Sequence, residues 1–226
     1  MLTLRQIEVI RAIMVTGTVG GAARLLNVSS PGISRDHISQ SMHYEEMLSW
    51  LLFYTSLLNV QKTPQVDITD PGGIVRSQVV ETTDGALRIA LNASQSPRTQ
   101  SSRFVNEYFG SGVQHIAFAS NDILASATWL KETGIQILRI PENYYDDLEA
   151  RVDIDPGLLK LLKDNNILYD RDANGEYLQL YTMSFKDLFF FEIVQRRGYK
   201  GFGAINAPIR LNVQSRLLSG STAFGL

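Results

Sequence analysis

The sequence contains an internal duplication. Two histidines, His37 and His115, lie 78 residues apart in similar settings, Asp-His-Ile-Ser and Gln-His-Ile-Ala. The two tryptophans of the chain, Trp50 and Trp129, follow these histidines by 13 and 14 residues, and leucine follows each of them. Because a fixed period of this kind indicates two copies of one structural unit, we predict repeats at about 36–95 and 113–197.

Residue patterns predict the same order of strands and one helix in both copies. Alternating and helical apolar patterns place the elements of the first copy at 36–42 (strand), 47–59 (helix), and 66–68, 74–80 and 87–92 (strands). Those of the second copy are expected at 113–120 (strand), 122–132 (helix), and 135–140, 167–170, 177–183 and 188–195 (strands), with a helical insertion over 144–152 and 158–165. The prediction is an α+β fold in which two βαβββ modules form one cup. Residues 211–226 are predicted to be a frayed tail.

Residues 1–35 have a helical pattern of their own. Gly17 ends a first helix, Thr18 can cap a second, and Pro31 fits the first position of a third. This segment carries a net charge of +3, while the rest of the chain carries −5. The stretch 18–35, with its paired alanines and its Ser-Pro-Gly-Ile-Ser-Arg sequence, resembles the start of LysR-type transcriptional regulators. The resemblance implies a partial helix-turn-helix that binds DNA weakly if at all.

His37, His115 and Glu192 are the candidate metal ligands. Glu192 follows His115 by 77 residues and lies on the last predicted strand. The chain has no cysteine, so imidazole and oxygen ligands must hold any metal. Pseudo-symmetry would bring the first strands of the two copies together across the cup. Two imidazoles and one carboxylate form the ligand set of non-haem Fe(II) oxygenases, so we expect Fe(II), with another divalent metal as the alternative.

The sequences around the three candidate ligands, together with Gly201-Phe202-Gly203, carry a family resemblance. Residues 36–210 resemble the metal-bearing C-terminal half of 4-hydroxyphenylpyruvate dioxygenases, of the vicinal oxygen chelate superfamily. They also resemble the dioxygenase-like C-terminal domains of two-domain bacterial 3-dehydroshikimate dehydratases. The resemblance implies that His37, His115 and Glu192 bind the metal, and that the substrate contacts Ser77, Asn92, Gln100 and Gln179. Gln114, beside His115, is a candidate to orient that ligand.

Three departures from the dioxygenase pattern imply an altered and more open pocket. Tyr181 and Ala207 each stand where those dioxygenases have phenylalanine, and a short polar tail is expected in place of their closing helix. The N-terminal segment and the metal site also compete for residues. A complete recognition helix would include His37, whereas the metal site needs it on a strand. We favour the strand because His115 requires a partner at the equivalent position.

Three functions therefore remain open. The chain is a non-haem iron dioxygenase acting on an α-keto acid or an aromatic-catabolism intermediate, a non-catalytic metal-binding remnant of a 3-dehydroshikimate dehydratase, or a LysR-type regulator. The expected partner is a small molecule, and self-association is left open. Because the sequence has neither a signal peptide nor a long apolar run, we expect a cytoplasmic protein without a membrane span.

Overall fold

The computed structural model describes residues 35–186 and 188–222. Contacts divide the chain into two units, Met1–Arg35 and Asp36–Leu226. All described residues except Arg35 belong to the second unit. The helix-turn-helix-like segment expected within 1–35 thus lies outside the described residues, Arg35 excepted. None of the helices in the described part is long and apolar enough to cross a membrane.

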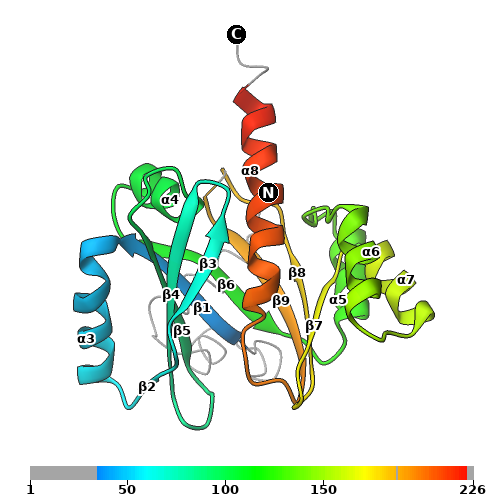
Figure 1. Cartoon of the computed structure of the whole chain (residues 1–226), viewed down its shortest axis with the longest axis horizontal. Helices are drawn as coiled ribbons and strands as arrows, with labels where there is room; N and C mark the ends of the chain where they lie inside the picture. Colours follow the sequence, from blue (N-terminus) through cyan, green and yellow to red (C-terminus); the bar gives the residue numbers. More distant parts are fainter. Residues whose placement is uncertain (1–34, 187, 223–226) are drawn as a thin grey trace. The chain divides into compact units, whose positions relative to one another are not determined.

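One curled, mixed sheet organises the fold (Figure 1). Its strands run in the order β2-β4-β5-β1-β6-β9-β8-β7, and β3 pairs with β4. The strand bounds are Arg35–His43 (β1), Gln61–Lys62 (β2), Val66–Asp70 (β3), Gly73–Glu81 (β4), Arg88–Ser94 (β5), Gly112–Ala119 (β6), Leu168–Arg171 (β7), Glu176–Tyr181 (β8) and Phe190–Arg197 (β9).

The two halves of the sheet repeat each other. In the first half β1 pairs in parallel with β5, which is antiparallel to β4, and in the second half β6 pairs in parallel with β9, which is antiparallel to β8. Ser39 lies opposite Ala90 in the first half, and Ala117 lies opposite Glu192 in the second. The halves meet where β1 neighbours β6. This arrangement confirms the predicted α+β fold of two βαβββ modules.

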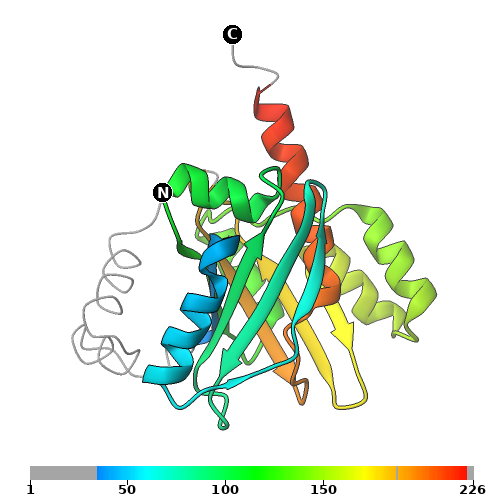
Figure 2. The same ribbon diagram turned by 60° about the vertical axis from the view of Figure 1, so that its left-hand side comes forward.

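The α-helices are Met47–Leu57 (α3), Gln100–Tyr108 (α4), Ile123–Glu132 (α5), Glu142–Arg151 (α6), Pro156–Asn165 (α7) and Ala207–Thr222 (α8). Helices α3, α5, α6 and α7 cover the outer face of the sheet, α4 lies at one end of the strands, and α8 lies on the inner side, between β3 and β8 (Figures 1 and 2). Met42 on β1 packs toward α3, in one core with Val80 and Leu91. Because side chains alternate along a strand, His37, Ser39 and Ser41 face the opposite side, which is the inside of the cup.

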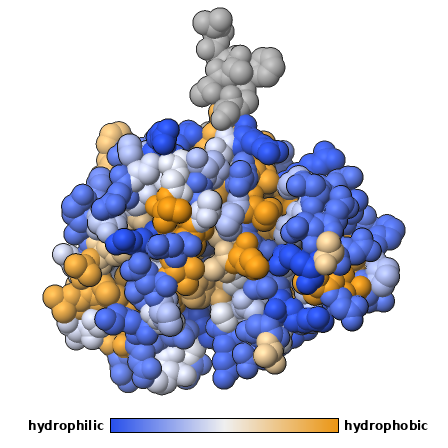
Figure 3. Space-filling model, in the orientation of Figure 1, coloured by the Kyte–Doolittle hydropathy of each residue, from blue (hydrophilic) through white to orange (hydrophobic). Residues whose placement is uncertain are grey.

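The outer side of α3 is apolar and exposed. Trp50, Leu51 and Tyr54 pack toward the sheet, and Tyr54 donates a hydrogen bond to Gln40 at 2.7 Å. Leu48, Leu52, Phe53 and Leu57 stay exposed, and the apolar surface at the left of Figure 3 lies over this helix. The helix is therefore apolar on both sides.

Two predictions for the body of the fold were wrong or incomplete. Residues 135–140 form no strand and make only the isolated bridge of Ile137 with Thr182. The backbone N–H of Ile140 donates to the side chain of Asn166 instead of to a strand, and Pro141 follows directly. Helix α4 was not predicted, although Thr99 caps it by accepting a hydrogen bond from the Ser102 N–H.

The prediction of a frayed, polar tail was also wrong. Instead of fraying, the chain forms α8, which continues to Thr222. Ile209 and Val213 pack against the core of the second half, and Leu211 is buried. Arg210 and Gln214 are buried beside them, so the buried side of the helix is partly polar and does not show the apolar periodicity that predicts a helix. A C-terminal helix is thus present.

Candidate metal centre

Three neighbouring strands bring His37, His115 and Glu192 together. They lie on β1, β6 and β9, which are adjacent at the middle of the sheet, and all three side chains are buried. The Nε2 atoms of His37 and His115 lie 3.2 and 3.4 Å from the same carboxylate oxygen, Oε2 of Glu192. The imidazole rings meet edge to face, with centroids 5.5 Å apart. One potential ligand atom from each residue lies within 4.8 Å of the others.

Two charged side chains, Asp36 and Arg196, orient His37. Its Nδ1 lies 2.9 Å from Oδ1 of Asp36, so the other ring nitrogen, Nε2, faces Glu192. Arg196 donates to both oxygens of Asp36, with Nη2 at 2.7 Å from Oδ1. The guanidinium also donates to the carbonyl of Gly201 and lies over the ring of Tyr177, 4.6 Å from its centroid. Asp36 is thereby fixed on both sides.

A second set of contacts orients Glu192. The amide of Gln179 donates from Nε2 to Oε1 of Glu192 at 2.9 Å, which leaves Oε2 to the two histidines. In turn, Oε1 of Gln179 accepts a hydrogen bond from Asn206 at 3.0 Å. Asn206 precedes α8 and also donates to the backbone carbonyl of Tyr169. The position of Glu192 thus depends on the polypeptide that leads into the C-terminal helix.

His115 has a different environment from His37. Phe190 stacks on its ring with centroids 4.7 Å apart. Its Nδ1 atom is buried and has no hydrogen-bond partner among the described residues. The expectation that Gln114 orients this ring is therefore not met, because consecutive strand residues point to opposite faces and Gln114 lines a separate pocket. Only Nε2 of His115 faces another polar group of the centre.

The electrostatics make the two histidines unequal. Burial lowers the pKa of His37, but the charge of Glu192 and the hydrogen bonds to Asp36 and Glu192 outweigh it and raise the pKa to about 9. For His115, burial dominates and lowers the pKa to about 4. Burial raises the pKa of Glu192, yet the charge of His37 and hydrogen bonds from both histidines hold it well below its usual range. Without a metal, at neutral pH, His37 carries the proton that both neighbours attract.

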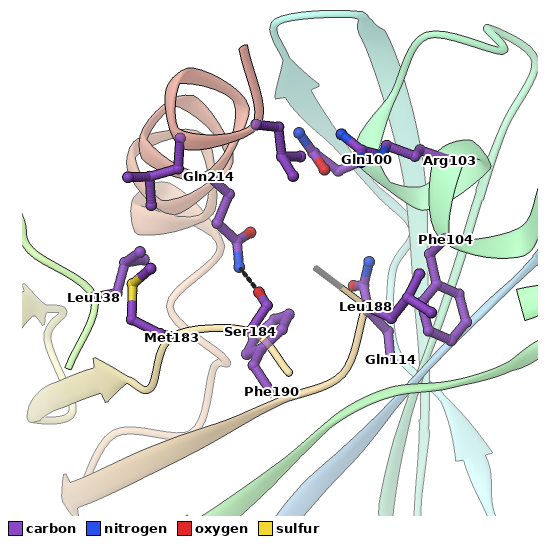
Figure 4. Close-up of a pocket in the computed structure, with 12 residues that line it drawn as sticks. Gln100, Arg103, Phe104, Gln114, Leu138, Met183, Ser184, Leu188, Phe190 and Gln214 are labelled. Carbon is purple, nitrogen blue, oxygen red and sulfur yellow. Dashed lines mark hydrogen bonds between the residues drawn. The ribbon is translucent and has the colours of Figure 1, made fainter. Parts of the chain in front are cut away.

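The predicted substrate residues lie in three places. Ser77 and Asn92 pair across β4 and β5 on the inner face, where Asn92 donates to Ser39 at 2.8 Å. Gln179 contacts Glu192 directly. Gln100 begins α4 and lines the pocket shown in Figure 4. Substrate binding by these four residues remains a prediction.

The pocket lies between α4, α8 and the segment that precedes β9 (Figure 4). Gln100, Gln114 and Gln214 supply amides to its lining, and Phe190 supplies an aromatic face. The Gln214 amide points toward Ser184, with Nε2 and Oγ 3.5 Å apart. Because Phe190 also stacks on His115, this ring separates the pocket from the histidine. Sequence reasoning missed Gln214, although a polar pair at 210 and 214, one helical turn apart, was a visible signal.

The family model described as Glyoxalase/Bleomycin resistance protein/Dioxygenase superfamily matches residues 36–164. A 3-dehydroshikimate dehydratase from Pseudomonas aeruginosa is 44% identical over 197 residues, which are 86% of this chain and 31% of that protein. A 4-hydroxyphenylpyruvate dioxygenase from Legionella pneumophila is 33% identical over 174 residues, which are 76% of this chain and 50% of that protein.

A solved structure has the same fold. A mutant of 4-hydroxymandelate synthase from Streptomyces coelicolor matches with a TM-score of 0.74 and 27% sequence identity, covering 81% of this chain and 54% of that one. The chain thus spans about a third to a half of the length of the relatives it matches.

Proposed function

The chain belongs to the glyoxalase/bleomycin resistance protein/dioxygenase superfamily, and from this premise we propose that His37, His115 and Glu192 hold a divalent metal. The observation that carries the proposal is the convergence of two imidazole Nε2 atoms on one carboxylate oxygen. The similarity to 4-hydroxyphenylpyruvate dioxygenases and to 4-hydroxymandelate synthase supports Fe(II) as this metal.

The residues present fit such an ion. With bonds of about 2.1 Å, neighbouring ligand atoms around a metal lie about 3 Å apart, close to the 3.2 and 3.4 Å that separate the histidine nitrogens from Glu192. The nitrogen of His37 that faces away from Glu192 is held by Asp36, an arrangement that fixes ring orientation in metal sites. Two imidazoles and one carboxylate, without any thiolate, suit Fe(II).

We propose a non-haem iron dioxygenase-like activity on an α-keto acid or an aromatic-catabolism intermediate. Bound Fe(II) would supply open coordination positions for a chelating substrate and for dioxygen. The protein's part is to hold Glu192 through Gln179, to hold His37 through Asp36, and to shield His115 with the ring of Phe190. These contacts hold the three side chains in place, and the remaining coordination positions of the ion would be open to the substrate.

A second candidate is a metal-binding domain without turnover, in a relative of 3-dehydroshikimate dehydratases. The 44% identity to such an enzyme, over 31% of its length, favours it. The regulator hypothesis rests on residues 1–35 and remains a prediction. Oxygen uptake by the Fe(II) protein with a panel of α-keto acids separates the two metal-based candidates, because only the first consumes oxygen.

Metal content tests the ligand assignment. We expect one metal per chain in the wild type and a large loss of metal in His115→Ala. His43→Ala is the matched control, because His43 lies at the exposed end of the same strand as His37 and outside the centre. Elemental analysis after gel filtration measures both variants. Equal metal content in the two variants would rule out the assignment.

A further inference from the structure

Arg210 is a buried cation on α8. Its residue surface is only 8% exposed. The guanidinium lies over two aromatic rings, 5.1 Å from the centroid of Phe190 and 5.5 Å from that of Tyr181. Its Nη1 donates a hydrogen bond at 2.7 Å to the side chain of Gln214, which is neutral. A full positive charge is thus placed among aromatic rings and an amide.

No carboxylate of the described part neutralises this charge. The buried acids there are Asp36, Asp70 and Glu192, and each has other partners. Asp36 pairs with Arg196, and Glu192 pairs with the two histidines. Asp70 accepts hydrogen bonds from the backbone N–H groups of Gly72 and Gln100. Because a buried charge without a counterion is unfavourable, Arg210 is a ready site for an anion.

Arg210 lies next to the metal centre, and two of its neighbours line the pocket. Phe190 contacts the guanidinium on one side and the His115 ring on another. Both Phe190 and Gln214, the hydrogen-bond partner of Arg210, line the pocket in Figure 4.

We propose that Arg210 binds a carboxylate of the substrate, at the end remote from the oxygens that chelate the metal. The proposal rests on the function proposed above and specifies its substrate class, a 2-oxo acid with a second carboxylate. A guanidinium can grip a carboxylate with two parallel hydrogen bonds. Gln214, the hydrogen-bond partner of the guanidinium, is neutral, so it adds no competing anion.

The test compares acids that differ only at their far end. 2-Oxoadipate carries a second carboxylate where 2-oxohexanoate has a methyl group, and 2-oxoglutarate and 2-oxopentanoate form a shorter pair. Isothermal titration of the Zn(II)-loaded protein measures their affinities without redox chemistry. We expect the dicarboxylate of at least one pair to bind about tenfold more tightly or better, as a charge-assisted hydrogen bond allows.

Three variants assign the effect to one side chain. Arg210→Met should remove the preference, and Arg210→Lys should restore part of it. Arg88→Met is the control, because Arg88 pairs with Glu81 and does not line the pocket. The control should keep the preference. Circular dichroism and zinc content verify that each variant folds and is loaded.

Two outcomes would overturn the proposal, namely equal affinities within both pairs for the wild type, or a preference that survives in Arg210→Met. Failure of the metal assignment is visible separately, as absence of zinc from the wild type. In that case the metal-free protein is titrated with hexanoate and with 1-hexanol. The Arg210 Nε–H resonance, identified by its loss in Arg210→Met, should shift with the acid and not with the alcohol. If the chemical shift of this resonance does not change when the acid is added, the proposal is also overturned.

Discussion

Replacing Asp36 with asparagine should destabilise the metal-free protein by about 2–4 kcal/mol. The Asp36 side chain is 4% exposed and that of Arg196 is 15% exposed. Breaking a buried ion pair leaves one charge without its partner and costs about 3–5 kcal/mol. Arg196 keeps the carbonyls of Tyr199 and Gly201 as acceptors, which favours the lower part of that range.

The pKa of Asp36 gives an independent value for this loss of stability. Burial raises this pKa, but the hydrogen bonds from Arg196 and His37 outweigh burial and lower it from 3.8 to about 2. A depression of nearly two units corresponds to about 2.5 kcal/mol. This stability is fully present above pH 3.8 and is lost as the pH falls through 2. Asp36→Asn should lack that acid-sensitive contribution.

Urea denaturation of the metal-free proteins measures the difference. The control is Glu81→Gln, which breaks the Arg88–Glu81 pair. That pair is 2.8 Å long, against 2.7 Å between Nη2 of Arg196 and Oδ1 of Asp36, but its side chains are 20% and 31% exposed, so we expect a loss of about 1 kcal/mol or less. If the two variants lose the same free energy of unfolding, burial is not what makes the Asp36 pair strong.

Three further outcomes are expected. Metal must displace the proton of His37, whose pKa is raised to about 9, so zinc affinity should rise roughly tenfold per pH unit between pH 6 and 8; a flat profile would contradict this. Gly203→Ala places a Cβ 2.6 Å from Oε1 of Gln179, at a φ of 62°, and should lower both stability and zinc affinity. The control is Gly134→Ala, which has a φ of 75° but no atom within 4 Å of the new Cβ, and it should lower stability alone, by about 1 kcal/mol. 4-Hydroxyphenylpyruvate should be turned over poorly, because Ala207 offers no aromatic face to its ring; rapid homogentisate formation would show that this aromatic is dispensable.

The duplication made the sheet predictable from the sequence. The equivalent histidines indicated which strands are equivalent and predicted that the first strands of the two modules come together across the cup; in the structure these strands, β1 and β6, are neighbours in the sheet. Glu192 was predicted on the last strand of the second module, and this strand, β9, pairs with β6. These inferences depend on the repeat spacing, which can be recognised even where the sequence pattern of a single strand or helix is ambiguous.

The remaining features depend on contacts between distant residues. Arg196 fixes Asp36 from 160 positions away, and no local pattern marks that partnership. Helix α8 was missed because its buried side contains Arg210 and Gln214. Gln179 was assigned to the substrate, yet its amide already donates to Glu192. In each case a buried polar side chain has a partner that only the folded chain reveals.

The strand register has a further consequence. Glu192 lies opposite Ala117, two residues after His115, and the equivalent position in the first module is Ala90, opposite Ser39. A perfectly symmetrical duplicate would therefore present a second carboxylate to the same ion and surround it with four protein ligands. The methyl group of Ala90 has no lone pair to offer. Under the proposed metal assignment, the departure from symmetry at this one alanine keeps a coordination position open for exchange with the solution.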